Sequence, residues 1–206
     1  MSLNDENVKI EEKEAPKKAP TAKKTSSFNA GFVEQIELIV IAFAAIVLIF
    51  SFLFRTCQVS GPSMENTLLD KETVIVSNLF YKPDRNDIIV FHQTGTLNEP
   101  VVKRVIGIPG DTVTVSHMTD KMIVTITDES GNTSILEEPY VKYDGYRPWM
   151  NDCTVYVEED TVFVMGDNRS NSNDSRGSDI GLVDTRRILG KVILRVSPFS
   201  RFGTVK

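Results

Sequence analysis

Pro100-Val101-Val102-Lys103-Arg104-Val105-Ile106-Gly107 is an apolar run that contains two adjacent cations. The aliphatic residues predict a buried β-strand, and strict alternation places Lys103 on one face of that strand and Arg104 on the other. Parity alone therefore leaves open which cation is buried. Burial among aliphatic side chains disfavours the charged form of a lysine and lowers its pKa. A lysine that is neutral near pH 7 can act as a general base.

A general base needs a group that gives up a proton, and the candidate is the turn Ser60-Gly61-Pro62-Ser63-Met64. Gly61 followed by Pro62 forces a turn that can expose the Ser63 hydroxyl together with its backbone N–H. A serine nucleophile uses both groups, because the hydroxyl attacks a carbonyl and the N–H stabilises the developing oxyanion. On its own the motif is a weak signal, since an ordinary loop has the same composition.

A third polar segment, Gly166-Asp167-Asn168-Arg169-Ser170-Asn171-Ser172-Asn173-Asp174-Ser175-Arg176, directly follows the apolar run 161–165. Such a density of Asp, Asn, Ser and Arg usually marks a solvated loop. The segment lacks the regular acid spacing and the closing Glu of an EF-hand, which argues against a calcium loop.

The composition excludes several classes of protein. The chain has 206 residues and a formal net charge of −5, and its folded part has no basic cluster with interleaved aromatic residues, so we expect no nucleic-acid partner. It has two histidines, His92 and His117, and two cysteines, Cys57 and Cys153, without the spacing of a zinc site. Glycine-rich phosphate loops are absent. The sequence leaves open whether the two cysteines are bridged or free.

Residues 38–54 carry no charge, one hydroxyl and otherwise only apolar side chains, and Arg55 follows them. With its flanks this run approaches the ~20 residues that cross a bilayer. A buried core helix would need a less uniformly apolar pattern, and a cleaved signal peptide would have a shorter apolar region and a small-residue cleavage site. We therefore predict an uncleaved transmembrane signal anchor over residues 31–55. The preceding residues 1–30 have almost no large apolar side chains and predict a disordered tail.

Charge around the span predicts its orientation. Lys17, Lys18, Lys23 and Lys24 precede it, whereas only Arg55 follows it before Lys71. The positive-inside rule then places the N-terminus in the cytoplasm and residues 56–206 outside it, as the extracytoplasmic domain of a single-pass protein of the cell membrane. The lipid bilayer is thus an expected partner.

The outer domain is predicted to be mainly β, a compact open or barrel-like sheet assembly. A β-ribbon insertion is expected over residues 116–158, with a hairpin turn at Asp128-Glu129-Ser130-Gly131-Asn132. The predicted strands are 73–77, 87–91, 101–106, 112–115, 122–126, 161–165 and 191–196.

Three motifs together carry a specific resemblance: SGPSMENTL from Ser60, KRVIGIPGD from Lys103 and GDNRSNSNDSR from Gly166. In this order after an N-terminal anchor they resemble the boxes of the bacterial type I signal peptidases, membrane-bound serine–lysine proteases. The resemblance covers roughly residues 30–206. The short insertion and the single span resemble the Gram-positive-like members. Asn66 stands where the family usually has proline and Asn86 where it often has glycine.

The resemblance implies a role for each matching residue. Ser63 matches the nucleophile and Lys103 the general base, and the oxyanion donors match the Ser63 N–H and the Ser60 hydroxyl. Four further residues match supporting positions: Ser172, which orients the lysine, Asp174 and Arg176, which form a salt bridge, and Asp167, a structural carboxylate. Neither a metal nor a cofactor is implied.

The implied substrates are preproteins whose signal peptides carry small residues at positions −1 and −3, with the secretion translocon expected nearby. Three other interpretations remain. A self-cleaving serine–lysine repressor would be soluble, which the span opposes. A sortase-like transpeptidase would need a cysteine and a histidine at its centre. An anchored, non-enzymatic adaptor would be expected to lack the serine or the lysine.

Overall fold

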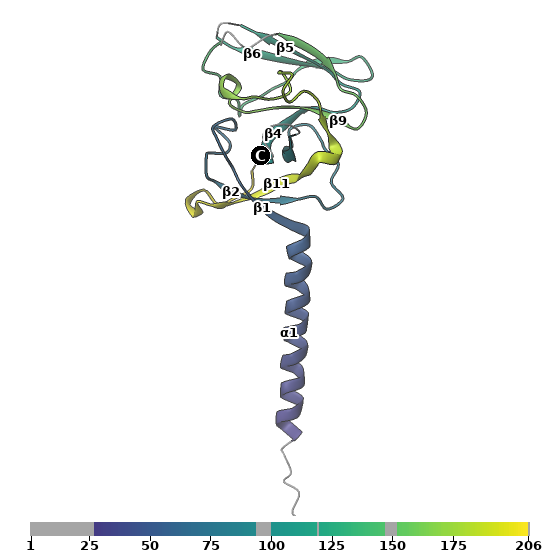
Figure 1. Ribbon diagram of the computed structural model, residues 1–206, viewed down its shortest axis with the longest axis vertical. Coiled ribbons are helices and arrows are strands. Elements are labelled where there is room, and N and C mark those ends of the chain that lie inside the picture. The colour runs from purple at the N-terminus through teal and green to yellow at the C-terminus, as the bar shows by residue number, and fades with distance from the viewer. Residues whose placement is uncertain (1–26, 94–99, 119, 147–151, 206) are drawn as a thin grey trace, which may run out of the picture. The chain divides into compact units, whose positions relative to one another are not determined.

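A computed structural model describes residues 27–93, 100–118, 120–146 and 152–205 of the chain. The chain divides after Ala45 into two compact units, which are described separately. Figure 1 shows the elements in chain order from α1 to the C-terminal residues.

Helix α1 runs from Ser27 to Leu53, and its segment Phe32–Leu53 has a mean hydropathy of 2.9 over 22 residues. At 1.5 Å per residue this segment measures about 33 Å, which matches the hydrocarbon thickness of a bilayer. Its side chains are not buried by the rest of the protein. It is the one segment among the described residues that is long and apolar enough to span a membrane. The helix begins at Ser27, so residues 27–30, expected in the disordered tail, are helical, and the rest of the expected tail lies outside the described residues. The helix ends at Leu53, so Phe54 and Arg55, expected in the anchor, begin a strand instead.

The β domain contains a seven-stranded sheet in which every neighbouring pair is antiparallel. The strand order is β1-β2-β11-β3-β4-β9-β10, which places β4 in the interior between β3 and β9. The strands are β1 Phe54–Gln58, β2 Thr73–Ser77, β3 Ile88–His92, β4 Pro100–Gly107, β9 Thr161–Met165, β10 Val183–Asp184 and β11 Ile188–Ser197.

A second sheet of four antiparallel strands has the order β7-β6-β5-β8. Its strands are β5 Thr112–His117, β6 Met122–Thr127, β7 Thr133–Ile135 and β8 Cys153–Tyr156. The predicted hairpin turn joins β6 to β7, where Gly131 N donates to Asp128 O over 2.8 Å. The stretch expected as a ribbon insertion is therefore part of a sheet that already begins at Thr112. In Figure 1 this sheet lies at the other end of the β domain from β1, β2 and β11.

Three apolar clusters hold the β domain together. One lies between the serine turn and β2, β3 and β11, and includes Met64 and Leu68. A second joins the four-stranded sheet to β4 and β9 through side chains such as Ile106 and Phe163. A third covers the other face of β3, β4 and β9. Because apolar clusters cover β4 on both faces, the strand is buried along most of its length.

The seven predicted strands are confirmed, with ends that differ by three residues at most. Strands β1, β7, β8 and β10 were not predicted. β1 follows the apolar helix without a linker, and the other three have four residues or fewer, too short for an alternating pattern to stand out. The 3₁₀ turns are η1 Arg169–Asn171, η2 Thr185–Arg187 and η3 Phe199–Arg201.

Candidate active site

Both cations of strand β4 are buried, although alternation along the strand places them on opposite faces. The exposed fraction is 3% for Lys103 and 1% for Arg104. In register, Lys103 lies opposite Ile89 of β3, and Arg104 lies between Ile88 of β3 and Met165 of β9. A strand covered on both faces has no solvated side, so each cation must find its own polar partner.

The partner of Lys103 is the serine turn, forty residues earlier in the chain. Lys103 Nζ donates to Ser63 Oγ over 2.8 Å and to the Val102 carbonyl oxygen over 3.1 Å. The turn is held by Gly61, whose backbone is left-handed with φ 82° and whose N–H donates to Asp70 Oδ1 over 2.8 Å. Beyond Ser63, Met64 and Leu68 anchor the same loop in the apolar cluster beneath it.

Burial lowers the pKa of Lys103 to about 8, from an ordinary value of 10.5. Desolvation is the largest cause, because the protein interior solvates an ammonium poorly. The carboxylates of Asp174 and Asp167 oppose the shift, and the Arg176 guanidinium adds to it. An appreciable fraction of Lys103 is therefore the free amine near neutral pH, positioned to accept a proton from Ser63.

The partner of Arg104 is Asp167. Arg104 donates to both carboxylate oxygens, with Nε to Oδ1 at 2.8 Å and Nη2 to Oδ2 at 2.7 Å, and both side chains are buried. The guanidinium carbon also lies 3.8 Å from the centre of the Tyr140 ring. The Thr67 hydroxyl of the serine loop donates to Asp167 as well. Asp167 thus ties the lysine strand to the serine loop.

Asp174 and Arg176 form a second pair, with Nε to Oδ1 at 2.7 Å and Nη2 to Oδ2 at 2.8 Å. Burial by itself would raise the pKa of the Asp174 carboxyl, but hydrogen bonds and charge from Arg176 hold that pKa below its ordinary value. Asp174 Oδ2 also accepts from the N–H of Gly166 over 3.0 Å. This pair fixes the start of the polar loop that follows β9.

Ser172 and Ser60 take up different surroundings. The Ser172 hydroxyl is buried and does not bond Lys103, and an interaction with the Ser172 side chain contributes to the lowered pKa of Asp174. Ser172 packs against Gly166, where an added Cβ would lie 2.6 Å from Ser172 Cβ and 2.5 Å from the Ser63 carbonyl oxygen. Only glycine lets these segments approach so closely. Ser60 is exposed, two residues before Pro62.

Two residues next to the reacting groups were not singled out from the sequence: Gly166 and Asn168. The backbone N–H of Asn168 donates to the Ser63 carbonyl oxygen over 3.0 Å, and its Nδ2 donates to the Pro62 carbonyl oxygen over 3.1 Å. Both residues lie in the GDN segment after β9, so the motif contained them. Their contacts depend on tertiary structure and leave no local pattern.

Both thiols and histidines lie in less reactive settings. Cys57 and Cys153 are free, and burial raises the pKa of each thiol. A raised pKa keeps a thiol protonated and makes it a poor nucleophile near neutral pH. His117 is bonded to Asp152 through Nδ1 over 3.0 Å. Among the described residues no group of three His, Cys, Asp or Glu side chains could hold a metal ion.

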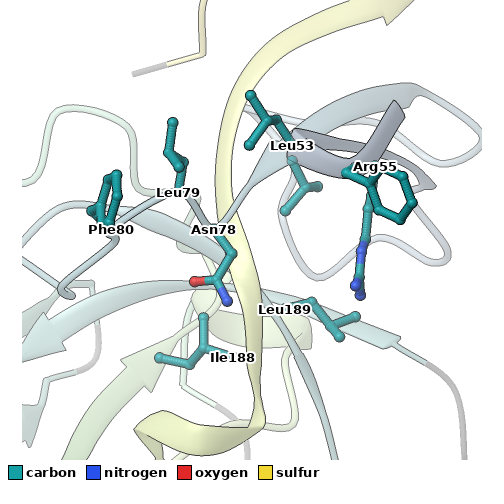
Figure 2. Close-up of a pocket in the computed structure, with 9 residues that line it drawn as sticks. Leu53, Arg55, Asn78, Leu79, Phe80, Ile188 and Leu189 are labelled. Atoms are coloured by element: carbon teal, nitrogen blue, oxygen red, sulfur yellow. The ribbon is translucent and has the colours of Figure 1, made fainter. Parts of the chain in front are cut away.

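Figure 2 shows a cavity whose lining includes neither Ser63 nor Lys103. Its volume is about 350 Å³. It lies where α1 ends and is lined by residues of the helix end, β1, the residues after β2, and β11. Its lining is apolar except for Arg55 and Asn78. This cavity is therefore distinct from the hydrogen-bonded pair of Ser63 and Lys103.

Comparisons with known proteins show which family the chain is similar to. Residues 32–197 match the family described as "Signal peptidase, peptidase S26". A signal peptidase I from Bacillus amyloliquefaciens is 36% identical over 194 residues, which cover 89% of this chain and 98% of that protein. A signal peptidase IB from Staphylococcus aureus is 32% identical over 188 residues, which cover 82% and 92%. A crystal structure of a signal peptidase I from Enterococcus faecalis V583 is 30% identical, covers 54% of this chain and 97% of that one, and has a TM-score of 0.41.

The chain therefore belongs to the signal peptidase family, peptidase family S26. It is a hydrolase of the signal peptidase I type, and the apolar helix α1 fits a transmembrane anchor.

Proposed function

We propose that this protein removes signal peptides by a serine–lysine dyad, with Ser63 as the nucleophile and Lys103 as the general base. The observation that carries the proposal is the 2.8 Å hydrogen bond between Lys103 Nζ and Ser63 Oγ, made by a buried lysine whose pKa is lowered to about 8. A base must lie within hydrogen-bond reach of the proton it takes and must be unprotonated at the working pH. Lys103 lies within this reach, and its lowered pKa leaves an appreciable fraction of it unprotonated near neutral pH.

In the proposed reaction, Ser63 Oγ attacks the carbonyl carbon at the cleavage site while its proton moves to Lys103 Nζ. The tetrahedral intermediate collapses, the C–N bond breaks, and Lys103 returns the proton to the leaving amine. An acyl-enzyme on Ser63 remains. A water molecule, deprotonated by Lys103, then attacks the ester carbonyl, and Ser63 leaves with the proton. The lysine is thus neutral at the start of each half-reaction.

Supporting roles follow from the contacts. The Ser63 N–H and the Ser60 hydroxyl are the proposed donors to the oxyanion, because both belong to the turn that carries the nucleophile. Asp167 and Asp174 bind Arg104 and Arg176, which fixes the strand and the loop. By the family resemblance, Ser172 is proposed to orient the lysine. None of these roles requires a metal or a cofactor.

The proposed substrates are preproteins whose signal peptides carry small residues at positions −1 and −3. An extended peptide can add beside the first residues of β4, because the pairing of β4 with β9 begins only at Arg104. In this proposal α1 crosses the cell membrane once, the residues before it lie in the cytoplasm, and residues 56–206 lie outside. That arrangement brings the site to the surface where signal peptides emerge beside the secretion translocon.

The test is cleavage of a preprotein with an Ala-x-Ala site by the intact chain, by Ser63→Ala and by Lys103→Met, in detergent. Ser130→Ala and Lys121→Met serve as matched controls, because both residues are exposed and lie in turns of the second sheet. We expect only the intact chain and the two controls to cut at that site. Cleavage by Ser63→Ala or Lys103→Met would show that the dyad is misassigned.

The same assay separates the other interpretations. Treatment of the intact chain with a thiol-alkylating reagent should leave cleavage unchanged, whereas a sortase-like enzyme would lose its activity. An intact chain that remains inert in lipid as well as in detergent would favour the adaptor.

A further inference from the structure

Asn168 makes three hydrogen bonds to the loop that carries Ser63. Its backbone N–H donates to the Ser63 carbonyl oxygen over 3.0 Å, and its Nδ2 donates to the Pro62 carbonyl oxygen over 3.1 Å. A longer bond of 3.4 Å joins Nδ2 to Glu65 Oε2. The residue is 2% exposed, so the loss of a partner would leave a buried polar group unpaired, which costs free energy.

The two carbonyls belong to the two peptide groups that flank the Ser63 Cα atom. A trans peptide group is planar, so its C=O and its N–H point in opposite directions. The Pro62 carbonyl shares its plane with the Ser63 N–H. A donor that fixes the direction of the Pro62 carbonyl therefore also fixes the direction of the Ser63 N–H. The Ser63 carbonyl lies in the next plane, so Asn168 holds the planes on both sides of the nucleophile.

Asn168 is itself rigidly held. Lys142 N donates to the Asp167 carbonyl oxygen over 2.8 Å, and Arg169 N donates to the Lys142 carbonyl oxygen over 2.8 Å, so the flanking residues pair with a neighbouring segment. Asp167 is bonded to Arg104, which is next to Lys103 in β4. The scaffold that positions the lysine thus also positions Asn168.

We propose that Asn168 is a positioning residue that aims the Ser63 N–H at the oxyanion. The proposal rests on the dyad described above and adds the residue that sets the direction of one oxyanion donor. Only an amide suits this position, because Nδ2 must donate to the Pro62 carbonyl and lies beside the Glu65 carboxylate. Aspartate has the same shape but would place an acceptor against two acceptors.

The experiment compares two ligands with one peptide sequence, one ending in an aldehyde and the other in the corresponding alcohol. The aldehyde can add Ser63 Oγ to its carbonyl carbon, with the proton passing to Lys103, and so places an oxyanion in the site. The alcohol forms no bond and reports ground-state binding. Affinities are measured for the intact chain and for Asn168→Ala, Asn168→Asp and Ser63→Ala. Asn171→Ala is the control, since Asn171 is an exposed neighbour in the same loop.

We expect Asn168→Ala and Asn168→Asp to weaken aldehyde binding about 10- to 100-fold and to leave alcohol binding unchanged. The loss should be smaller than the roughly 100- to 1,000-fold loss on removal of an oxyanion donor, because the Ser63 N–H is still present and only its direction is released. For cleavage, kcat should fall by a similar factor at constant KM. Asn171→Ala should match the intact chain in every measurement. Equal losses for aldehyde and alcohol, or no loss for either, would overturn the proposal. So would melting of both Asn168 variants below the assay temperature, because Asn168 would then be needed for folding.

Ser63→Ala distinguishes failure of this inference from failure of the proposed function. If the intact chain binds the aldehyde no better than the alcohol, or Ser63→Ala retains the preference, Ser63 is not the nucleophile. If that preference depends on Ser63 but survives both Asn168 substitutions, the dyad stands and the role of Asn168 is refuted.

Discussion

Lys103 and Arg104 are adjacent in β4, yet they differ in the cost of their burial. The charge of Arg104 is compensated by Asp167, which accepts hydrogen bonds from it through both carboxylate oxygens. Lys103 has no carboxylate within hydrogen-bond distance among the described residues, and its polar contacts are a hydroxyl and a carbonyl. The sequence predicted a buried cation in this strand but not that both would be buried, because alternation assumes that one face meets solvent. The burial of both faces of β4 depends on tertiary packing, which the local sequence does not reveal.

The pH dependence of cleavage follows from the pKa of Lys103. Since the base must be neutral, kcat/KM should rise about tenfold per pH unit below pH 8 and level off above it, as Lys103 loses its proton at about 8. The measurement is kcat/KM from pH 5.5 to 9.5 with a peptide lacking titratable groups. A rate that does not change between pH 6 and pH 9 would contradict the role of Lys103.

Stability should respond to the same group. Below pH 8 Lys103 is charged in both the folded and the unfolded state, and the depressed pKa then costs the folded state about 3 kcal/mol. Between pH 8 and 10.5 the folded chain has lost the proton that the unfolded chain retains, so stability rises with pH. Lys103→Met should therefore raise the free energy of unfolding at pH 6 by about 1–3 kcal/mol, after its lost hydrogen bonds are subtracted, and by less at pH 10.

Denaturant unfolding at the two pH values measures this difference, with Lys121→Met as the exposed control. An equal effect of Lys103→Met at pH 6 and pH 10 would mean that the lysine is charged in the folded state throughout this range.

At the scale of elements, the strands that bear the site were predictable because each is long and apolar. The positions of β4 and β9 as neighbours were not predictable, because sequence order places β5 to β8 between them. Asp167 joins these elements: it follows β9, binds Arg104 of β4 and accepts from Thr67 of the serine loop. The motif identified the carboxylate, whereas its partners became evident only from the fold.

Asp167→Asn should therefore be far more disruptive than its small change in size suggests. Removing one charge leaves Arg104 buried without its carboxylate, and breaking a buried pair in this way costs about 3–5 kcal/mol. Asp184→Asn is the matched control, because it removes a similar bidentate pair with Arg186, whose side chain is 85% exposed. We expect no resolvable change in the control, measured by thermal unfolding of the full chain. Equal effects would show that burial does not govern the Arg104–Asp167 pair.

At the scale of the whole chain, the last residues of the β domain return to the serine loop. Arg195 of β11 donates from Nη1 to the Thr67 carbonyl oxygen over 3.0 Å. Arg201 of η3 binds the buried carboxylate of Glu72 over 2.7 Å. Thr67 and Glu72 follow Ser63 in the same loop, so the C-terminal segment holds the far side of the turn that carries the nucleophile. No local pattern near residue 201 predicts a partner 129 residues earlier.

Because the C-terminal segment contacts the serine loop, we expect Arg201→Ala to affect that loop from outside the site. Loss of Arg201 leaves Glu72 with the longer 3.4 Å contact to Arg195, so we expect a loss of about 1–3 kcal/mol in the free energy of unfolding. Cleavage should slow through kcat, because the Ser63 turn gains freedom, while the pH midpoint stays near 8, since the surroundings of Lys103 are unchanged. Arg201→Lys should restore part of the stability and part of kcat, because it keeps the charge but has a single donor group.

Arg187→Ala, at an exposed position in η2, is the control. A shifted pH midpoint in Arg201→Ala would place its effect on the lysine instead, and an unchanged kcat would show that the loop holds its geometry without the C-terminal segment.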